Sequence, residues 1–244
     1  MERHAKYGID APGVVGAHII LGLLLAVIAS IGLALPGPNP IPAPVSIGAA
    51  FFAALLLSYA AVMLISSLVG KKRIRDHLVA ALALSGNERV LDAGCGRGLA
   101  LIGCAKELTT GQAVGIDLWL AKDLSRNNPE ATYANAAVEG VADRVAVETG
   151  DIIQIPFPDA FFDVVISMIV LHNIPSREGR DRALGEFVRV LKPGGRMAIF
   201  DILHTSRYAD RLRQEGMAVR ELRRHFAWLV PSRSLLATKP FHQP

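Results

Sequence analysis

A long stretch without formal charge constrains this fold most strongly: residues 11–70 contain no Asp, Glu, Lys or Arg. The Pro-rich segment Pro36 to Pro44 divides the stretch into two apolar runs, Val14 to Leu35 and Val45 to Val69. At about 1.5 Å rise per helical residue, the runs reach roughly 33 and 37 Å, enough to cross a hydrocarbon core of about 30 Å. Because lipid leaves no partner for a free peptide group, both runs are predicted to be helices joined by the Pro-rich turn. The sequence therefore predicts a transmembrane helical hairpin within residues 1–70.

Basic residues flank the two runs, and the segment between them carries no charge. They are Arg3 and Lys6 before the first run, and Lys71, Lys72, Arg73 and Arg75 after the second. Since positive flanks stay on the cytoplasmic side, both ends are predicted to face the cytoplasm. The chain is thus expected in the cell (inner) membrane as a multi-pass protein with its catalytic domain in the cytoplasm.

Two other interpretations of the apolar runs are less consistent with the sequence. A cleaved signal peptide fits poorly because the first run is long and a second span follows it. Two buried helices of a soluble protein fit poorly because neither run has the polar face of a globular surface helix. His18 lies near one end of its span and is interpreted as an interfacial residue rather than a ligand.

The remainder, residues 71–244, has the length of one soluble domain. It carries the whole formal charge of +4, because Arg3 and Lys6 balance Glu2 and Asp10. The excess clusters at residues 71–75 and 207–224, which favours contact with anionic lipid headgroups over a nucleic-acid groove. An ordinary solvated basic surface remains an alternative for the second cluster.

The order of elements in this domain predicts an α/β fold. An amphipathic helix begins at Lys71 and is expected to close at Ser85-Gly86-Asn87. Short apolar strands then alternate with helices, which predicts a doubly wound, mostly parallel sheet with helices on both faces. The expected strands are Arg89–Asp92, Ala113–Asp117, Val145–Thr149, Phe162–Met168 and Arg196–Asp201, and the expected helices end at Leu108 or span Pro129–Val141 and Arg177–Leu191. Ala218–Leu222 and Ser234–Thr238 are expected to form a final antiparallel pair separated by Pro231.

A Gly-rich turn ends the first of these strands. Its glycines, Gly94, Gly96 and Gly98, follow Asp92 and flank Cys95, and such a turn lets the backbone approach a ligand at a helix N-terminus. The pattern is GxGxG, and Leu99 stands where a dinucleotide fingerprint would want Gly or Ala. This weakens the alternative of a nicotinamide-dependent oxidoreductase.

Acidic residues also end the next two strands. Asp117 is placed to accept hydrogen bonds from both hydroxyls of a ribose, and Asp151 from an exocyclic amine such as that of adenine. Ile152 can cover the face of the base. Each carboxylate could instead be a turn or cap residue, but three at successive strand ends favour one ligand site.

Together these residues resemble class I S-adenosylmethionine-dependent methyltransferases, especially the small-molecule branch that includes quinone and sterol methyltransferases. The motifs are Val90 to Gly98, Gly115-Ile-Asp117, Gly150-Asp151, Phe162 to Ser167 and Leu191 to Met197, within roughly residues 75–205. The resemblance implies a Rossmann-like, seven-stranded sheet whose last strand is antiparallel. It also implies that Asp92 and the backbone at Gly94 to Gly96 hold the methionine end of the cofactor, Asp117 the ribose, and Asp151 with Ile152 the adenine. The full set of expected cofactor contacts is Asp92, Gly94, Cys95, Gly96, Gly98, Asp117, Leu118, Asp151, Ile152 and Ser167.

His172, just after the fourth strand, is the expected catalytic residue. Methyl transfer from a sulfonium needs alignment, and a general base helps when the acceptor is a hydroxyl, thiol or carbon acid. His172 could instead be a packing or loop residue, and His204 is a second candidate base. Cys95 and Cys104 form no CxxC or Cys/His set, so neither a metal site nor a disulfide is expected.

The acceptor is predicted to be a hydrophobic small molecule or a lipid. The segment after the fourth strand lacks the Asn-Pro-Pro-Tyr or Asp-Pro-Pro-Tyr tetrapeptide that holds planar amines in relatives acting on nucleobases or amides, and aromatic residues are sparse in the basic clusters. A nucleic-acid substrate is therefore disfavoured. The alternative function is a non-catalytic, membrane-tethered S-adenosylmethionine-binding module, and no oligomeric state is predicted.

Overall fold

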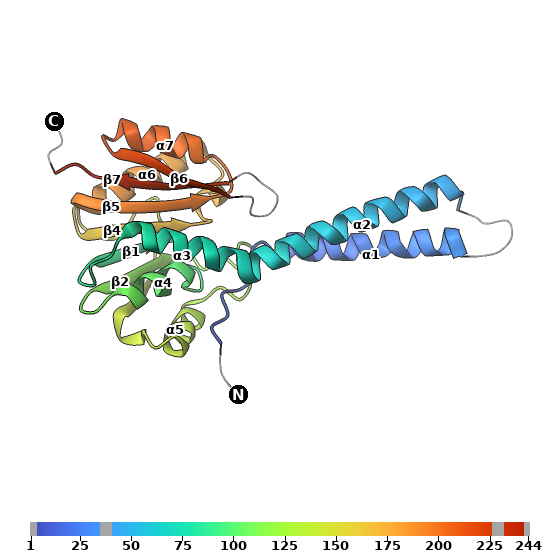
Figure 1. Cartoon of the computed structure of the whole chain (residues 1–244), viewed down its shortest axis with the longest axis horizontal. Helices are drawn as coiled ribbons and strands as arrows, with labels where there is room; N and C mark the ends of the chain where they lie inside the picture. The colour runs from blue at the N-terminus through green and yellow to red at the C-terminus, as the bar shows by residue number, and fades with distance from the viewer. Residues whose placement is uncertain (1–3, 35–40, 226–231, 242–244) are drawn as a thin grey trace.

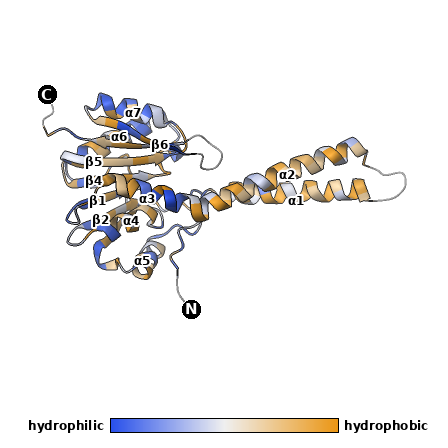
Figure 2. Cartoon of the chain, in the orientation of Figure 1, coloured by the Kyte–Doolittle hydropathy of each residue, from blue (hydrophilic) through white to orange (hydrophobic). Residues whose placement is uncertain are grey.

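A computed structural model describes residues 4–34, 41–225 and 232–241, and Figure 1 shows an α/β body from which a long helical hairpin projects. Helix α1 (Pro12–Ala34) lies along α2 (Ala43–Ile65), and both are long and apolar enough to cross a membrane. In Figure 2 the two helices are mostly coloured as hydrophobic, whereas the body mixes hydrophobic and hydrophilic segments. Small residues bring the two helices close, because a Cβ at Gly22 would lie 2.8 Å from the Leu57 side chain. Most of the predicted Pro-rich turn lies outside the described residues.

The second apolar helix does not end where the charges begin. One π-helical turn, Ser66–Gly70, carries α2 directly into α3 (Lys71–Leu82), which packs on the body. Helix α3 closes at Ala83, whose φ of 47° is left-handed, two residues before the predicted closing segment.

The prediction that the basic cluster at residues 71–75 contacts lipid headgroups is wrong for Lys71. Lys71 is buried, Arg75 is half-buried, and Lys72 and Arg73 are exposed. The π-helical turn widens the helix at this point and brings Ser67 and Lys71 to the side that faces the N-terminal segment.

The predicted seven-stranded sheet is confirmed, with the order β3-β2-β1-β4-β5-β7-β6. Strand β7 is antiparallel to both of its neighbours, β5 and β6, whereas the pairs among β1 to β5 are parallel. The strands are β1 (Arg89–Ala93), β2 (Gln112–Asp117), β3 (Val145–Thr149), β4 (Phe162–Met168), β5 (Leu191–Asp201), β6 (Ala218–His225) and β7 (Ser232–Thr238). Strand β5 begins at Leu191, five residues before the expected start at Arg196, and its pairing with β4 is irregular in this first part. Pro231 lies outside the described residues.

Helices cover both faces of the sheet, as predicted. In addition to α3, they are α4 (Leu99–Glu107), α5 (Pro129–Val138), α6 (Arg177–Val190) and α7 (Thr205–Gln214), of which the sequence pattern did not indicate α7. Alternate residues of one strand serve opposite faces: Val90 joins the core under α3 and α4, and Leu91 joins the core under α6 and α7. The first core also contains Tyr7, Val15 and Met63, so the base of the hairpin is packed into the α/β body.

Candidate functional site

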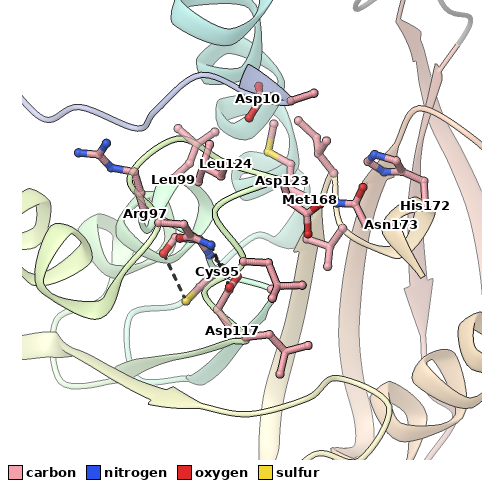
Figure 3. A pocket seen from close by; sticks show the side chains of 18 of the residues that line it. Asp10, Cys95, Arg97, Leu99, Asp117, Asp123, Leu124, Met168, His172 and Asn173 are labelled. Atoms are coloured by element: carbon pink, nitrogen blue, oxygen red, sulfur yellow. Dashed lines mark hydrogen bonds between the residues drawn. The ribbon is translucent and has the colours of Figure 1, made fainter. Parts of the chain in front are cut away.

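A cavity of about 310 Å³ lies at the carboxyl ends of the parallel strands, where the hairpin meets the body. It is lined by nine of the residues singled out in the sequence: Asp92, Gly94, Cys95, Gly96, Asp117, Leu118, Asp151, Ile152 and His172. Figure 3 shows Asp10, Asp117 and His172 arranged around it. We call Asp92, Cys95, Asp117, Asp151 and Ile152 the strand side, and Tyr7, Asp10, Tyr59, Met63 and Lys71 the hairpin side.

Gly98 and Ser167 do not line the cavity. The Ser167 hydroxyl donates to the carbonyl oxygen of Ala93 at 2.8 Å and so ties β4 to β1. Gly98 has a φ of 81° and forms the N-cap of α4, where a Cβ would lie 2.8 Å from Thr132. Both residues thus have structural roles next to the cavity.

The Gly-rich turn is folded by bonds to the end of β2. The N–H groups of Gly94 and Cys95 donate to the carbonyl of Ile116 at 2.8 and 3.0 Å, and that of Gly96 donates to Asp117 Oδ2 at 2.8 Å. Gly94 has a φ of 81°, and a Cβ there would lie 2.4 Å from Val170, so only glycine fits. The turn thus uses these three N–H groups to hold its own shape.

Asp92 is a buried carboxylate with one unused oxygen. Its Oδ2 accepts from the N–H of Leu101 at 2.7 Å, while Oδ1 is buried with no hydrogen-bond partner among the described residues. Burial raises the pKa of Asp92 to about 7, the nearby Asp117 charge adds to the rise, and the Leu101 bond opposes it. Such a group is suited to a cationic partner.

Asp117 is held in a fixed orientation at the end of β2. In addition to the Gly96 bond, its Oδ1 accepts from the N–H of Trp119 at 2.6 Å and from Asn127 Nδ2 at 3.1 Å. Asn127 also lines the cavity, and its own Oδ1 is buried without a partner in the described part of the chain. A ligand hydroxyl at this point would find acceptor oxygens from both side chains.

Asp151 follows β3 in a short turn. Its Oδ1 accepts from the N–H of Ile153 at 3.1 Å, so the turn role and a position on the cavity wall coexist. Ile152 is buried beside it. Cys95 also lines the cavity, but burial holds the pKa of its thiol well above the usual range, so it is no nucleophile.

His172 follows β4, lines the same cavity and is paired with a buried carboxylate. Its Nδ1 is 2.6 Å from Asp201 Oδ1, and its backbone N–H donates to Asp201 Oδ2 at 2.9 Å. Asp201 is completely buried at the end of β5. With Nδ1–H donated to Asp201, the Nε2 atom is left as an acceptor, which is the form a general base requires.

His204 has a different position. It is exposed, lies in the left-handed conformation at the N-cap of α7 and does not line the cavity.

Residues 6–11, which we call the N-terminal strap, contribute Tyr7 and Asp10 to the hairpin side of the cavity. Lys71 Nζ donates to the carbonyls of Tyr7 and Gly8 at 3.1 and 2.9 Å and to Asp10 Oδ1 at 2.9 Å. Asp10 Oδ2 accepts from the Ser67 hydroxyl at 2.9 Å. Burial lowers the pKa of Lys71, and Asp10 opposes that shift.

The N-terminal strap is also bonded to the loop that follows β2. The N–H of Ile9 donates to Ser125 Oγ at 2.8 Å, and that of Ala11 to the carbonyl of Asp123 at 3.0 Å. This loop carries Leu118, which lines the cavity, so the strap, α2 and the loop form one continuous wall.

Sequence reasoning missed Asp201, Asn127 and the whole hairpin side. Asp201 could have been found, because it is a carboxylate at a strand end like the three that were singled out. Asn127 and Tyr59 have no local signal of this kind.

The α/β body is similar in sequence to known methyltransferases. Residues 91–199 match the family model described as a methyltransferase domain. The chain is 35% identical over 156 residues to 27-O-demethylrifamycin SV methyltransferase of Amycolatopsis mediterranei, covering 60% of this chain and 53% of that protein. It is 36% identical over 138 residues to demethylmenaquinone methyltransferase of Lactiplantibacillus plantarum, covering 56% and 54%.

The fold is similar to that of magnesium protoporphyrin IX methyltransferase from Synechocystis, solved with bound S-adenosylmethionine. The TM-score is 0.59 at 21% identity, over 73% of this chain and 83% of that one. The chain spans about half the length of the curated relatives it matches. Helices α1 and α2 lie outside the matched region.

Proposed function

We propose that this chain, which carries an S-adenosylmethionine-dependent methyltransferase domain, is a membrane-anchored methyltransferase acting on a hydrophobic small molecule or lipid. One observation carries the proposal. The strand-end carboxylates Asp92, Asp117 and Asp151 line one cavity at the base of an apolar hairpin, together with His172, which is paired with the buried Asp201.

The polar groups of the strand side fit the donor. The unpartnered Oδ1 of Asp92 suits the ammonium of the methionine end, and the acceptor oxygens of Asp117 and Asn127 suit the ribose hydroxyls. Asp151 and Ile152 are assigned to the adenine. When bound, S-adenosylmethionine supplies a methyl group on a positively charged sulfur, which becomes a neutral thioether as the methyl leaves.

His172 is assigned the role of general base. Its Nε2 takes the proton of an acceptor O–H, S–H or C–H, and the buried Asp201 stabilises the imidazolium that forms. Apolar lining residues such as Val170 and Ile202 are assigned to limit the access of water to the reacting atoms.

The hairpin is assigned to the bilayer. Large apolar side chains such as Ile20, Leu24 and Phe51 are 63%, 57% and 65% exposed, which is unfavourable in water over so large a surface. Lys72 and Arg73 remain exposed at the base and favour a cytoplasmic position for the α/β body, at the inner membrane. The relatives include enzymes named for demethylmenaquinone and sterols, which are small-molecule acceptors.

The test is transfer of a labelled methyl group. The purified chain in detergent is incubated with labelled S-adenosylmethionine and a lipid extract of its own host, and the labelled product is identified by mass. We expect label in an apolar component. Tight donor binding with no labelled product from any membrane extract would instead support a non-catalytic binding module.

A further inference from the structure

The cavity extends beyond the methyltransferase domain into the apolar hairpin. Tyr59 and Met63, which belong to α2, line the cavity together with Asp92 and His172. Met63 lies eight residues before Lys71, about 12 Å along the helix axis. If Lys72 and Arg73 lie at the headgroups, Met63 and Tyr59 lie at or below the boundary of the hydrocarbon.

These two side chains form an ordered wall. Met63 is buried in the core shared by the hairpin and the body, and Tyr59 is half-buried with its ring 5.1 Å from that of His18 on α1. An aromatic residue with a polar tip is typical of the membrane interface. Both apolar helices therefore contribute to this end of the cavity, directly or through a ring contact.

The part of the rim formed by the loop after β2 is also apolar. Leu118 and Leu120, on the loop after β2, line the cavity and are 49% and 41% exposed. Ile169, Val170 and Ile202 continue this wall toward His172. Exposed leucines at a cavity rim are explained if lipid or an apolar ligand covers them.

We propose that the base of the hairpin is an acceptor subsite that admits an apolar substrate directly from the bilayer. The substrate keeps its apolar tail at the level of Tyr59 and Met63 and points an O–H, S–H or acidic C–H head toward His172. This inference rests on the proposed function and adds the position of the acceptor subsite and the route by which the acceptor enters. A water-soluble acceptor would not require a cavity wall formed by the apolar helix α2.

Two matched pairs of variants test the subsite in nanodiscs with the full chain. Tyr59→Ala removes an aromatic side chain from the cavity, and Phe52→Ala removes one from the same helix where it is 55% exposed and does not line the cavity. Met63→Trp narrows the cavity, and Ile65→Trp adds the same bulk at a position 63% exposed to the surroundings. We expect Tyr59→Ala and Met63→Trp to lower kcat/KM for the labelled lipid component about tenfold relative to their controls, with unchanged affinity for S-adenosylhomocysteine. Equal rates within each pair would overturn the proposal.

A binding measurement keeps the inference separate from catalysis. A phenol carrying a dodecyl chain with a photoreactive diazirine is incorporated into the nanodiscs and activated in the presence of S-adenosylhomocysteine. We expect crosslinks at residues 59–63 in excess of those at the lipid-facing residues 51–52, and suppression of the excess by Met63→Trp. Such labelling without any methyl transfer would retain the subsite and refute the proposed activity. Labelling no stronger at 59–63 than at 51–52 would refute the subsite even if the enzyme is active.

Discussion

The strand side and the hairpin side of the cavity are built in different ways. On the strand side, the Asp117 carboxylate is held by the turn of the neighbouring strand and by residues just after its own strand. On the hairpin side, Lys71 reaches back to Gly8 and Asp10 at the start of the chain. The strand side is thus formed by the sheet itself, whereas the hairpin side exists only when α2 and the N-terminal strap are docked. We therefore expect donor binding to depend on the strand side, and methylation of the acceptor to depend on the hairpin side.

The largest expected effect is that of Asp117→Ala on donor binding. The variant removes the acceptor for the ribose and for the N–H groups of Gly96 and Trp119. Because hydrogen bonds to a charged group contribute about 1.5–3 kcal/mol each, we expect the affinity for S-adenosylhomocysteine to fall at least about 100-fold, below detection by calorimetry. Membrane insertion, followed by resistance to carbonate extraction, should be unchanged. Asp151→Ala is the matched control, with a smaller loss of affinity, and unchanged binding in Asp117→Ala would show that the strand side is not the donor site.

The second effect concerns the turnover number, which depends on His172 in the proposed mechanism. His172→Ala removes the proposed base, and we expect kcat to fall about 100-fold or more while donor affinity stays within about twofold. Asp201→Asn can no longer fix the tautomer or stabilise the imidazolium, so it should lower kcat in the same direction. Partial restoration of His172→Ala by added imidazole would separate a chemical role from a packing role. A variant with normal turnover would leave His172 as a loop residue.

The strand side could be predicted from the sequence because its signals are local. A Gly-rich turn and carboxylates at strand ends indicate their positions within a few residues, and Asp92, Asp117 and Asp151 do line one cavity. The mostly parallel character of the sheet followed from the alternation of strands and helices, and its seven strands from the family resemblance. Asp201 was within reach of this reasoning, since it ends β5 as the others end their strands.

The hairpin side could not be predicted because it depends on contacts between distant residues. Lys71 follows an apolar run and precedes other basic residues, a pattern typical of a headgroup contact, yet its ammonium is buried against the N-terminal strap. A π-helical turn at Ser66–Gly70 joins α2 to α3 just before Lys71, and no residue pattern in the sequence indicates it.

The third effect tests this long-range assembly. Lys71→Met leaves the Asp10 carboxylate, whose side chain is 17% exposed, with Ser67 but no cation. We expect the docked state of the N-terminal strap to lose about 2–3 kcal/mol, less than for a fully buried pair because Asp10 keeps some solvent. Hydrogen exchange at residues 6–11 measures the loss directly. The double variant Asp10→Asn/Lys71→Met carries no unpaired charge and should recover part of the protection, whereas equal exchange in wild type and Lys71→Met would show that the ion pair does not hold the strap.

The smallest expected effect is a pH dependence that belongs to the strand side alone. The pKa of Asp92 is raised by burial from 3.8 to about 7. In the free protein this group therefore favours the folded state most below about pH 4, and that contribution is lost as the pH rises to about 7. Binding a cation has the opposite requirement, because the ammonium needs the carboxylate in its charged form.

Affinity for S-adenosylhomocysteine should thus rise about tenfold per pH unit between pH 5.5 and 7 and then level off, with about one proton released on binding at pH 6. Calorimetry in buffers of different ionisation enthalpy measures both quantities. Asp92→Asn keeps an acceptor for the Leu101 N–H but cannot ionise, so its affinity should be low and independent of pH. Because Asp10 and Lys71 lie on the hairpin side, the double variant Asp10→Asn/Lys71→Met should keep the wild-type slope. A flat wild-type profile would mean that Asp92 does not meet the ammonium, and a slope lost in the double variant would mean that the two sides of the cavity are electrostatically coupled.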